Sequence, residues 1–301
     1  MRKGETPVPE LPEMETYRTM LNERVAGKTV KAVEVTREKT INVPVEAFRA
    51  RTEGRTLARI DRRAKMLLFR LDGGDTLVLH LMLGGSMFYG TPEEAPDRTA
   101  QVILSFEEDD KRLYFHGLRL GYLHIYDAAD LEAKLAKFGP EPLDPGFGPT
   151  DLEARLRRSR GALKFALTDQ AVLAGIGNCY ADEMCFAAGI HPLRKVGDVS
   201  AAELRTLYAA MHSTLAEAMR YGGYMESPLF VGDELTGGYN DRCKVYDRGG
   251  EPCFRCGTPI TKTESNGRKV FFCERCQGQG GERDAREHGD ATEARRLSHQ
   301  H

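Results

Sequence analysis

Two C-x-x-C pairs near the C-terminus constrain this chain more than any other feature. Cys253 and Cys256 form the first pair, Cys273 and Cys276 form the second, and residues 257–272 separate them. Two such knuckles joined by a hairpin place four thiolates at the corners of a tetrahedron, which is the ligand set of a structural Zn²⁺ site. The alternative is two unrelated reduced pairs. We expect a zinc ribbon over residues 241–277 that holds one structural Zn²⁺, because four protein ligands leave no open position for catalysis.

Composition narrows the class of protein further. The chain has 301 residues, which favours two domains, and its seven cysteines are an odd number. This usage favours metal thiolates in a reducing cytoplasm over disulfides. The formal net charge of −2 excludes a globally basic DNA-packaging protein, although it allows local basic faces. No apolar run approaches the roughly 20 residues of a membrane helix, and no signal peptide is visible.

Hydrophobic periodicity divides the chain into an N-terminal β region and a helical region. Residues 11–26 have helical spacing and end at Gly27, after which short apolar segments alternate with turns. This pattern is typical of an antiparallel β-sandwich. The expected strands cover residues 30–35, 66–71, 76–83, 101–106, 112–115 and 122–126.

The second half has a different character. A Pro/Gly-rich segment at residues 139–149 is expected to link a sandwich domain at 9–138 to a helical domain and loop at 150–240. Gly175-Ile176-Gly177 interrupts the helical pattern, as in a helix-turn-helix. Residues 278–301 are polar and are predicted to be a disordered tail. The predicted fold class is α+β multidomain, with a leading helix before the sandwich and the zinc ribbon at the end.

Basic residues gather in three places that favour nucleic acid as a partner. One run extends from Arg49 to Arg70, a second from Arg155 to Lys164, and the hairpin between the cysteine pairs carries Lys262, Arg268 and Lys269. A helix that begins at Asn178 also offers backbone N–H groups to a phosphate. Each basic run taken alone is explained more simply as a solvent-exposed face. Three such runs in a near-neutral chain indicate a surface along which DNA or RNA binds.

Several motifs in the same order resemble one family, the formamidopyrimidine-DNA glycosylases, which excise oxidised purines. The matching segments are Pro9-Glu10-Leu11-Pro12-Glu13, Arg62-Arg63-Ala64-Lys65, His80-Leu81 with Gly85-Ser86, Gly139-Pro140-Glu141-Pro142-Leu143, Gly175-Ile176-Gly177-Asn178 through Glu183, and Gly250-Glu251-Pro252-Cys253. The resemblance covers roughly residues 9–277. The related endonuclease VIII branch is less similar, since it typically carries Gly where this chain has Leu11.

The resemblance implies a bifunctional DNA glycosylase/AP lyase of base excision repair that binds damaged or abasic duplex DNA between a β-sandwich and a helix–two-turn–helix domain. In that family the amine of a terminal proline attacks the sugar C1′, so Pro9 is the implied nucleophile and Glu10 the implied acid. An α-amine with a pKa of about 8 has a usable neutral fraction near pH 7. Lys65, Asn178 and Arg268 are the implied phosphate ligands, and Arg268 also the implied aid to elimination. The resemblance further implies a monomer in the bacterial cytoplasm, associated with the nucleoid.

One departure from the family concerns the nucleophile. Pro9 is internal here, and the nitrogen of an internal proline is an amide that cannot attack. Residues 1–8 form a leader, and Val8 directly precedes Pro9. A GTG valine codon can also start translation, and Lys3-Gly4-Glu5 back-translates to a purine-rich ribosome-binding site. Our hypothesis is that Met1–Pro7 is a gene-start artefact and that the mature chain begins at Pro9.

A second departure concerns the wedge that fills the space left by a flipped base. The family uses Met, Arg and Phe, where this chain carries Leu83, Leu118 and Leu120. Leucines can still intercalate, but Leu118 cannot donate hydrogen bonds to the orphaned base. The alternative for all three leucines is core packing.

Two other functions are compatible with these residues. A non-catalytic damaged-DNA-binding protein on the same scaffold is expected if the leader is real, because the amine is then blocked. A zinc-ribbon module associated with RNA or transcription leaves the motif at residues 9–13 unexplained.

The cysteine spacing yields the first testable prediction. The four paired cysteines should bind one Zn²⁺ per chain, and a chelator should unfold the ribbon, because metal binding and folding are coupled in such sites. Metal analysis of purified protein and of the Cys253→Ser variant measures this. Substitution of Cys179, Cys185 or Cys243 should leave the zinc content unchanged, and zinc loss in those variants would contradict the ligand assignment.

Overall fold

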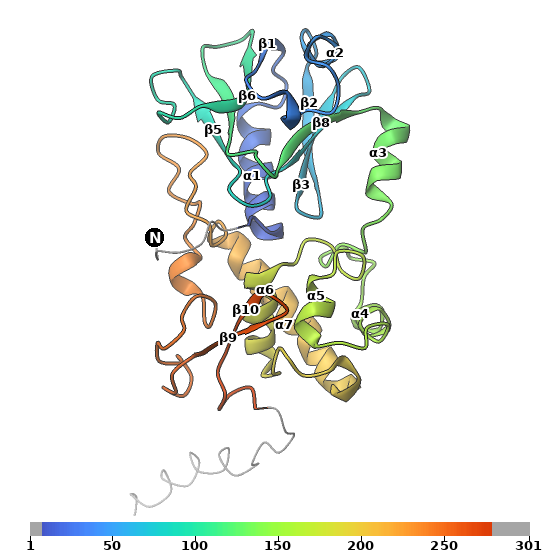
Figure 1. Cartoon of the computed structure of the whole chain (residues 1–301), viewed down its shortest axis with the longest axis vertical. Coiled ribbons are helices and arrows are strands. Elements are labelled where there is room, and N and C mark those ends of the chain that lie inside the picture. Colours follow the sequence, from blue (N-terminus) through green and yellow to red (C-terminus); the bar gives the residue numbers. More distant parts are fainter. Residues whose placement is uncertain (1–7, 279–301) are drawn as a thin grey trace, which may run out of the picture.

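Strands with alternating buried residues build the first lobe of the computed structural model, which describes residues 8–278 (Figure 1). β6 (Ala100–Phe106) shows the pattern most clearly, since every second residue is buried. The eight strands of this lobe form two four-stranded sheets in which all neighbours are antiparallel. One sheet has the order β1 (Val30–Val35), β6, β7 (Arg112–His116) and β5 (Ser86–Gly90). The other has the order β2 (Leu57–Arg63), β3 (Met66–Leu71), β4 (Thr76–His80) and β8 (Tyr122–Tyr126).

Residues from both sheets share one hydrophobic core. Phe69 of β3 packs edge-on against Phe115 of β7, with ring centroids 6.2 Å apart. The helix α1 (Leu11–Arg24) adds Met14 and Tyr17 to the same cluster. The predicted β-sandwich with a leading helix is therefore confirmed.

Some elements differ from the prediction. β2 was not predicted, because its sequence is dominated by arginines, and β5 was not, because its apolar residues directly follow a glycine turn. The strand expected over 76–83 ends at His80, since Met82 (φ +51°) and Gly84 (φ +85°) turn the chain. Two helices, α2 (Val45–Thr52) and α3 (Ala128–Leu135), also flank these strands, and a short 3₁₀ turn, η1 (Glu38–Thr40), precedes α2.

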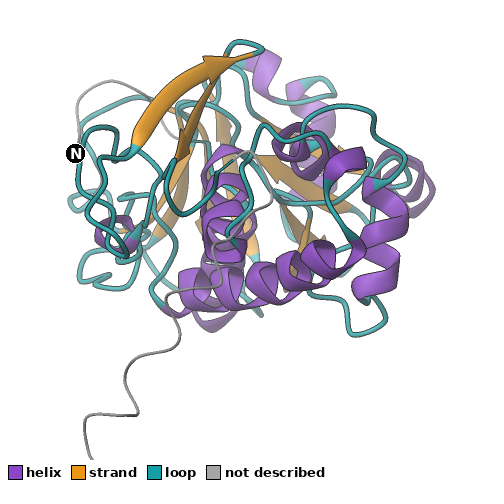
Figure 2. Ribbon diagram, turned by 90° about the horizontal axis from the view of Figure 1, so that it is seen from below, coloured by secondary structure: helices purple, strands orange, loops and turns teal. Residues whose placement is uncertain are grey.

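Helices form the second lobe, as predicted. These helices lie below the sheets of the first lobe in Figure 1, so in the view from below they lie in front of the strands (Figure 2). The helices are α4 (Pro149–Leu156), α5 (Leu163–Thr168), α6 (Asn178–Ala188) and α7 (Ala201–Arg220), with short 3₁₀ turns η2 (Val196–Asp198) and η3 (Asn240–Arg242). Gly175 has a φ of +90°, and the predicted break at residues 175–177 separates α5 from α6. Ser200 caps α7 by accepting a hydrogen bond from the N–H of Glu203.

A buried ion pair joins the helices to the C-terminal ribbon, which consists of β9 (Thr261–Ser265) and β10 (Arg268–Phe272). Lys164 Nζ lies 2.8 Å from Asp182 Oδ2, and both side chains are 0% exposed. Lys164 also donates to the carbonyl of Lys269 at 2.7 Å, while Asp182 accepts from the N–H of Phe271 at 3.0 Å. Lys164 was predicted to belong to a basic track, and its burial shows that this placement was wrong.

The ends of the chain lie outside the described residues. The leader hypothesis for Met1–Pro7 and the predicted disorder of most of the tail therefore concern residues 1–7 and 279–301, which the structure does not describe. Within residues 8–278, no helix is both long and apolar enough to cross a membrane.

The buried pair of Lys164 and Asp182 predicts that removing one charge destabilises the fold more than removing both. Asp182→Ala leaves the ammonium of Lys164 buried without its carboxylate, so the free energy of unfolding should fall by about 3–5 kcal/mol. The double variant Lys164→Met/Asp182→Leu should recover most of that loss, because it removes both charges. Urea unfolding measures both values, and equal losses in the two variants would contradict the ion-pair account.

Candidate active site

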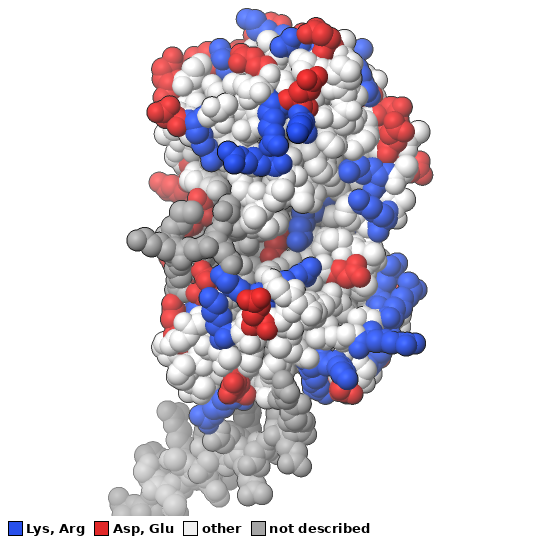
Figure 3. Space-filling view, in the orientation of Figure 1, with Lys and Arg blue, Asp and Glu red and all other residues white. Residues whose placement is uncertain are grey.

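A cleft of about 1000 Å³ lies between the two lobes and the ribbon. Basic and acidic side chains both reach the surface between the two lobes (Figure 3). The lining includes Val8 and Glu10 before α1, Lys65 from the β2–β3 turn, Leu83–Ser86, Gly177 and Asn178, Tyr224–Ser227, and Lys262 and Arg268 of the ribbon. The cleft thus brings together residues that are far apart in the sequence.

Glu10 is the central residue of this cleft. Its side chain is 2% exposed, and its carboxylate accepts hydrogen bonds from the N–H groups of Gly177 at 2.7 Å and Cys179 at 2.9 Å. These are the free N–H groups at the start of α6, where the helix dipole favours an anion. The sequence predicted that a phosphate binds at this helix start. The carboxylate of Glu10 occupies the N–H groups of Gly177 and Cys179, so those two groups are taken, and the phosphate role of Asn178 stays a prediction.

The side chains of Lys65 and Glu10 both lie next to Gly177. A Cβ atom on Gly177 would lie 2.6 Å from Lys65 Nζ and 2.8 Å from the carboxyl carbon of Glu10, so any other residue there would displace these side-chain ends. Burial lowers the pKa of Lys65, and the charges of Glu10 and Glu13 oppose that shift. Burial likewise raises the pKa of Glu10, opposed by Lys65 and by the backbone donors of α6. The low-dielectric site therefore favours a neutral amine and a protonated acid more than water does.

Glu13 extends this network beneath Glu10. Its carboxylate accepts from the backbone N–H of Glu10 at 2.9 Å, from the Tyr180 hydroxyl at 2.6 Å and from the N–H of Tyr224 at 2.7 Å. Burial raises the pKa of Glu13 to about 8, and the charge of Glu10 adds to the shift. Glu13 thus holds the start of α1 against the helical lobe.

Pro9 is buried between Val8 and Glu10, which both line the cleft. The hydroxyl of Tyr224 donates to the carbonyl of Val8 at 3.0 Å. That carbonyl belongs to the peptide group that includes the Pro9 nitrogen. The implied nucleophile therefore lies between two residues that line the cleft, and its nitrogen is an amide when Val8 precedes it.

Asn178 and Arg268 both line the cleft. Asn178 is half-buried, and its side-chain Oδ1 is buried without a hydrogen-bond partner among the described residues. Arg268 is exposed at the start of β10 and donates to Thr168 Oγ1 at 2.9 Å. The guanidinium of Arg268 and the side-chain NH₂ of Asn178 are the groups of these residues that can donate to a phosphate.

Three family models match successive parts of the chain. They describe the formamidopyrimidine-DNA glycosylase N-terminal domain (residues 8–122), its H2TH domain (138–227) and a zinc finger found in FPG and IleRS (250–278). The formamidopyrimidine-DNA glycosylase of Geobacillus kaustophilus is 38% identical over 274 residues, which cover 90% of this chain and 100% of the relative. The chain belongs to the formamidopyrimidine-DNA glycosylase family.

Solved structures of this family share the fold. The MutM (Fpg) protein of Thermus thermophilus superposes with a TM-score of 0.80 at 37% identity, covering 90% of this chain and 100% of that one. The Lactococcus lactis Fpg in complex with DNA containing an abasic site has a TM-score of 0.83 at 28% identity, covering 89% and 99%. These matches support the predicted order of sandwich, helix–two-turn–helix region and zinc ribbon.

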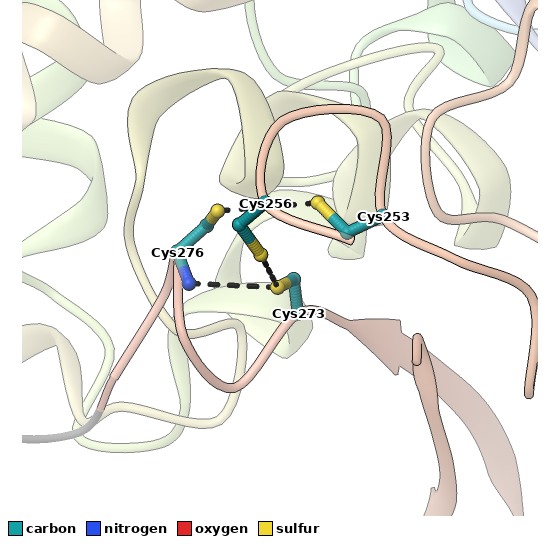
Figure 4. Close-up of side chains that lie close together, drawn as sticks. All are labelled: Cys253, Cys256, Cys273 and Cys276. Carbon is teal, nitrogen blue, oxygen red and sulfur yellow. Dashed lines mark hydrogen bonds between the residues drawn. The ribbon is translucent and has the colours of Figure 1, made fainter. Parts of the chain in front are cut away.

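The four paired cysteines converge as the family's zinc finger requires (Figure 4). Their sulfur atoms all lie within 4.8 Å of one another, with Cys253 and Cys276 3.9 Å apart and Cys256 and Cys273 3.5 Å apart. Zn–S bonds of about 2.3 Å give a tetrahedral S···S edge of about 3.8 Å, so the cluster fits one structural zinc ion. The other three cysteines, Cys179, Cys185 and Cys243, are buried elsewhere.

The three leucines of the predicted wedge differ in environment. Leu83 is 45% exposed and lines the cleft, and Leu120 is 60% exposed. Leu118 is 1% exposed and belongs to the core of the sandwich. Core packing, the alternative considered for all three, therefore describes Leu118, and its assignment as a DNA-contacting wedge does not fit this structure. The wedge role of Leu83 and Leu120 stays a prediction.

The basic run of the first lobe is largely neutralised. Arg51 pairs with Asp75, Arg70 with Asp61, and Arg63 with Glu141. These arginines brace the sheets and the linker, so they form less of a DNA track than the sequence predicted. The sequence did not indicate a role for Tyr224, and it offered Glu13 only as one residue of the motif at residues 9–13. Their contacts join segments that are far apart in the chain, which no local pattern indicates.

Gly177 provides a direct test of the cleft. Gly177→Ala should push Lys65 Nζ and the Glu10 carboxylate apart and lower base excision on the order of 10- to 100-fold, as misplacement of about 1 Å can. Gly197→Ala is the matched control, because a Cβ there meets no atom within 4 Å. Single-turnover excision kinetics measure both, and an unchanged rate in Gly177→Ala would refute the close Glu10–Lys65 approach.

Proposed function

We propose that this member of the formamidopyrimidine-DNA glycosylase family is a bifunctional DNA N-glycosylase and AP lyase that excises damaged, chiefly oxidised, bases by a Schiff-base mechanism at Pro9. Its role as a DNA glycosylase in base excision repair follows from the family. The observation that carries the residue assignment is the convergence of Val8, Glu10 and Lys65 in one cleft, with Pro9 between the first two. The damaged nucleotide must be flipped out of the duplex to reach it.

The first chemical step needs a free amine at Pro9. Its lone pair forms a bond to the sugar C1′, while the bond from C1′ to the base breaks and its electron pair leaves with the base. The nitrogen then loses its proton to solvent, and its lone pair forms a C1′=N double bond as the bond from C1′ to the ring oxygen breaks, which leaves a cationic imine. Glu10 supplies the proton that the sugar ring oxygen takes up on ring opening or that the departing base needs, and its raised pKa favours the protonated form that can donate.

The second step uses the positive charge of the resulting imine. The iminium group withdraws electrons from C2′, a proton leaves that carbon, and the C3′–O bond breaks with expulsion of the 3′ phosphate. Lys65, Asn178 and Arg268 bind DNA phosphates, with Arg268 also assisting elimination, and Leu83 and Leu120 fill the space left by the flipped base. The zinc ion is structural and holds the ribbon that carries Arg268.

The proposal extends to the oligomeric state of the protein and to the cellular compartment in which it acts. We further propose that the protein acts on double-stranded DNA as a monomer, because Lys65, Asn178 and Arg268, the proposed phosphate ligands, already line one cleft. Seven cysteines without a disulfide among them, all within residues 8–278, are typical of a reducing compartment, which supports the bacterial cytoplasm, with nucleoid association through DNA.

One observation favours a second candidate function. With Val8 attached, the Pro9 nitrogen is an amide, and the Tyr224 hydroxyl holds the Val8 carbonyl in the cleft. A chain that keeps this peptide bond is a damaged-DNA-binding protein without Schiff-base chemistry.

Borohydride trapping separates the two functions. Protein that begins at Pro9 should form a covalent adduct with abasic or oxidised duplex DNA, whereas protein that retains Met1–Val8 should bind the same DNA without trapping. Intact-mass measurement identifies the first residue of each form. Full trapping by the longer form would refute Pro9 as nucleophile and direct attention to Lys65, and trapping by neither form would favour the binding protein.

Glu10→Gln tests the proposed acid. Base excision should fall on the order of 10²–10⁴-fold, because a positioned general acid contributes about that much. Cleavage at a preformed abasic site should fall less, since no base has to leave. Equal losses in both reactions would contradict a role for Glu10 in base departure.

A further inference from the structure

The linker between the lobes touches the turn that carries Lys65. Glu141 Oε1 accepts a hydrogen bond from the backbone N–H of Ala64 at 2.7 Å. The same carboxylate pairs with Arg63 Nη1 at 3.0 Å and, through Oε2, with Arg62 Nη2 at 2.8 Å. One side chain of the linker thus holds three consecutive residues, Arg62 to Ala64, that immediately precede Lys65.

This turn needs an external partner to keep its conformation. Ala64 has a φ of +52°, in the left-handed region, which is unfavourable for a residue with a Cβ. Such a conformation persists only where surrounding contacts determine it. Ala64 is 1% exposed, and the carboxylate of Glu141 satisfies its N–H. The direction in which Lys65 leaves the turn therefore depends on Glu141.

The linker is also held by the second lobe. Arg63 Nη2 donates to the carbonyl of Gly139 at 2.7 Å, and the N–H of Gly139 donates to the carbonyl of Gln170 at 2.7 Å. The N–H of Ala174 donates to the carbonyl of Pro140 at 3.0 Å. The linker therefore connects the β2–β3 turn to the loop that leads into Gly177, and these two segments meet again where Lys65 Nζ approaches Gly177.

We propose that Glu141 is a positioning residue that sets Lys65 in the cleft and fixes its placement relative to the helical lobe. This inference rests on the proposed role of Lys65 in binding a DNA phosphate. Glu141 itself contacts neither DNA nor the reacting atoms. The linker is thus part of the phosphate-binding machinery as well as a covalent connection between the lobes.

A double-mutant cycle in the full chain tests this proposal without requiring catalysis. The probe is a duplex with a tetrahydrofuran abasic analogue, and its dissociation constant is measured between about 50 and 200 mM salt. Lys65→Ala should weaken binding about tenfold and reduce the slope of log K against log salt by about 0.9, the value for one lost phosphate contact. Glu141→Ala should reproduce most of both changes, and the double variant should bind no more weakly than Lys65→Ala.

Matched variants separate positioning from general destabilisation. Glu15→Gln removes another carboxylate partner of Arg62, at 2.8 Å, but does not touch the linker or Ala64, so it should leave binding and slope unchanged. Glu141→Gln keeps an acceptor for the Ala64 N–H and should show a smaller loss than Glu141→Ala. It also gives the same test if the alanine variant does not fold.

The outcomes distinguish this inference from the proposed function. Additive losses, or a Glu141 variant with the wild-type slope, would refute the positioning role while leaving Lys65 in place. A wild-type slope in Lys65→Ala would remove the phosphate role of Lys65 and this inference with it. An equal loss in Glu15→Gln would show that the arginine pairs, not the linker carboxylate, position the turn.

Discussion

The buried carboxylate of Glu10 is the contact on which the arrangement of this protein depends. It caps α6 in the second lobe from a position that immediately precedes α1 in the first, so one side chain replaces the phosphate or solvent that an open helix start attracts. Burial disfavours the ionised form of Glu10 and raises its pKa, while Lys65 and the helix N–H groups oppose that shift. The two lobes are consequently joined at the point where the proposed chemistry occurs, rather than at a distance from it.

A layer of tyrosines and Glu13 supports this junction. The hydroxyl of Tyr180 and the backbone N–H of Tyr224 both donate hydrogen bonds to Glu13. The two tyrosine rings pack edge to face, with their centroids 5.7 Å apart. Every one of these groups is buried, so an incompletely satisfied network would be expensive and the geometry is tightly determined. That rigidity suits a nucleophile that must approach C1′ within a narrow range of distance and angle.

The ribbon is held by two different kinds of contact. Four cysteine sulfurs converge to bind zinc at one end, while the pair of Lys164 and Asp182 anchors β10 to α5 and α6 at the other. Arg268 begins β10 and is itself exposed. An exposed cation on a doubly anchored strand can reach DNA with little loss of conformational entropy, because its backbone is already ordered.

The sequence alone determined the features that depend on local spacing. The two C-x-x-C pairs predicted the zinc ribbon, alternation predicted the sandwich, and Gly175 to Gly177 predicted the break before α6. The motif at residues 9–13 identified Glu10 as a candidate acid. Strand β2 was missed because its arginines obscure the apolar residues Leu57 and Ile60 that face the core.

Only the tertiary structure decided which polar groups meet. It paired the N–H groups of Gly177 and Cys179 with Glu10, buried Lys164 and Leu118, and placed Glu141 against Ala64. These contacts join residues as far apart in sequence as Glu10 and Cys179. Their free energies depend on burial and on competing partners, which no local pattern encodes. Residue types and spacing therefore specify the elements and the metal site, whereas the packing of the lobes specifies how each charge in the cleft is used.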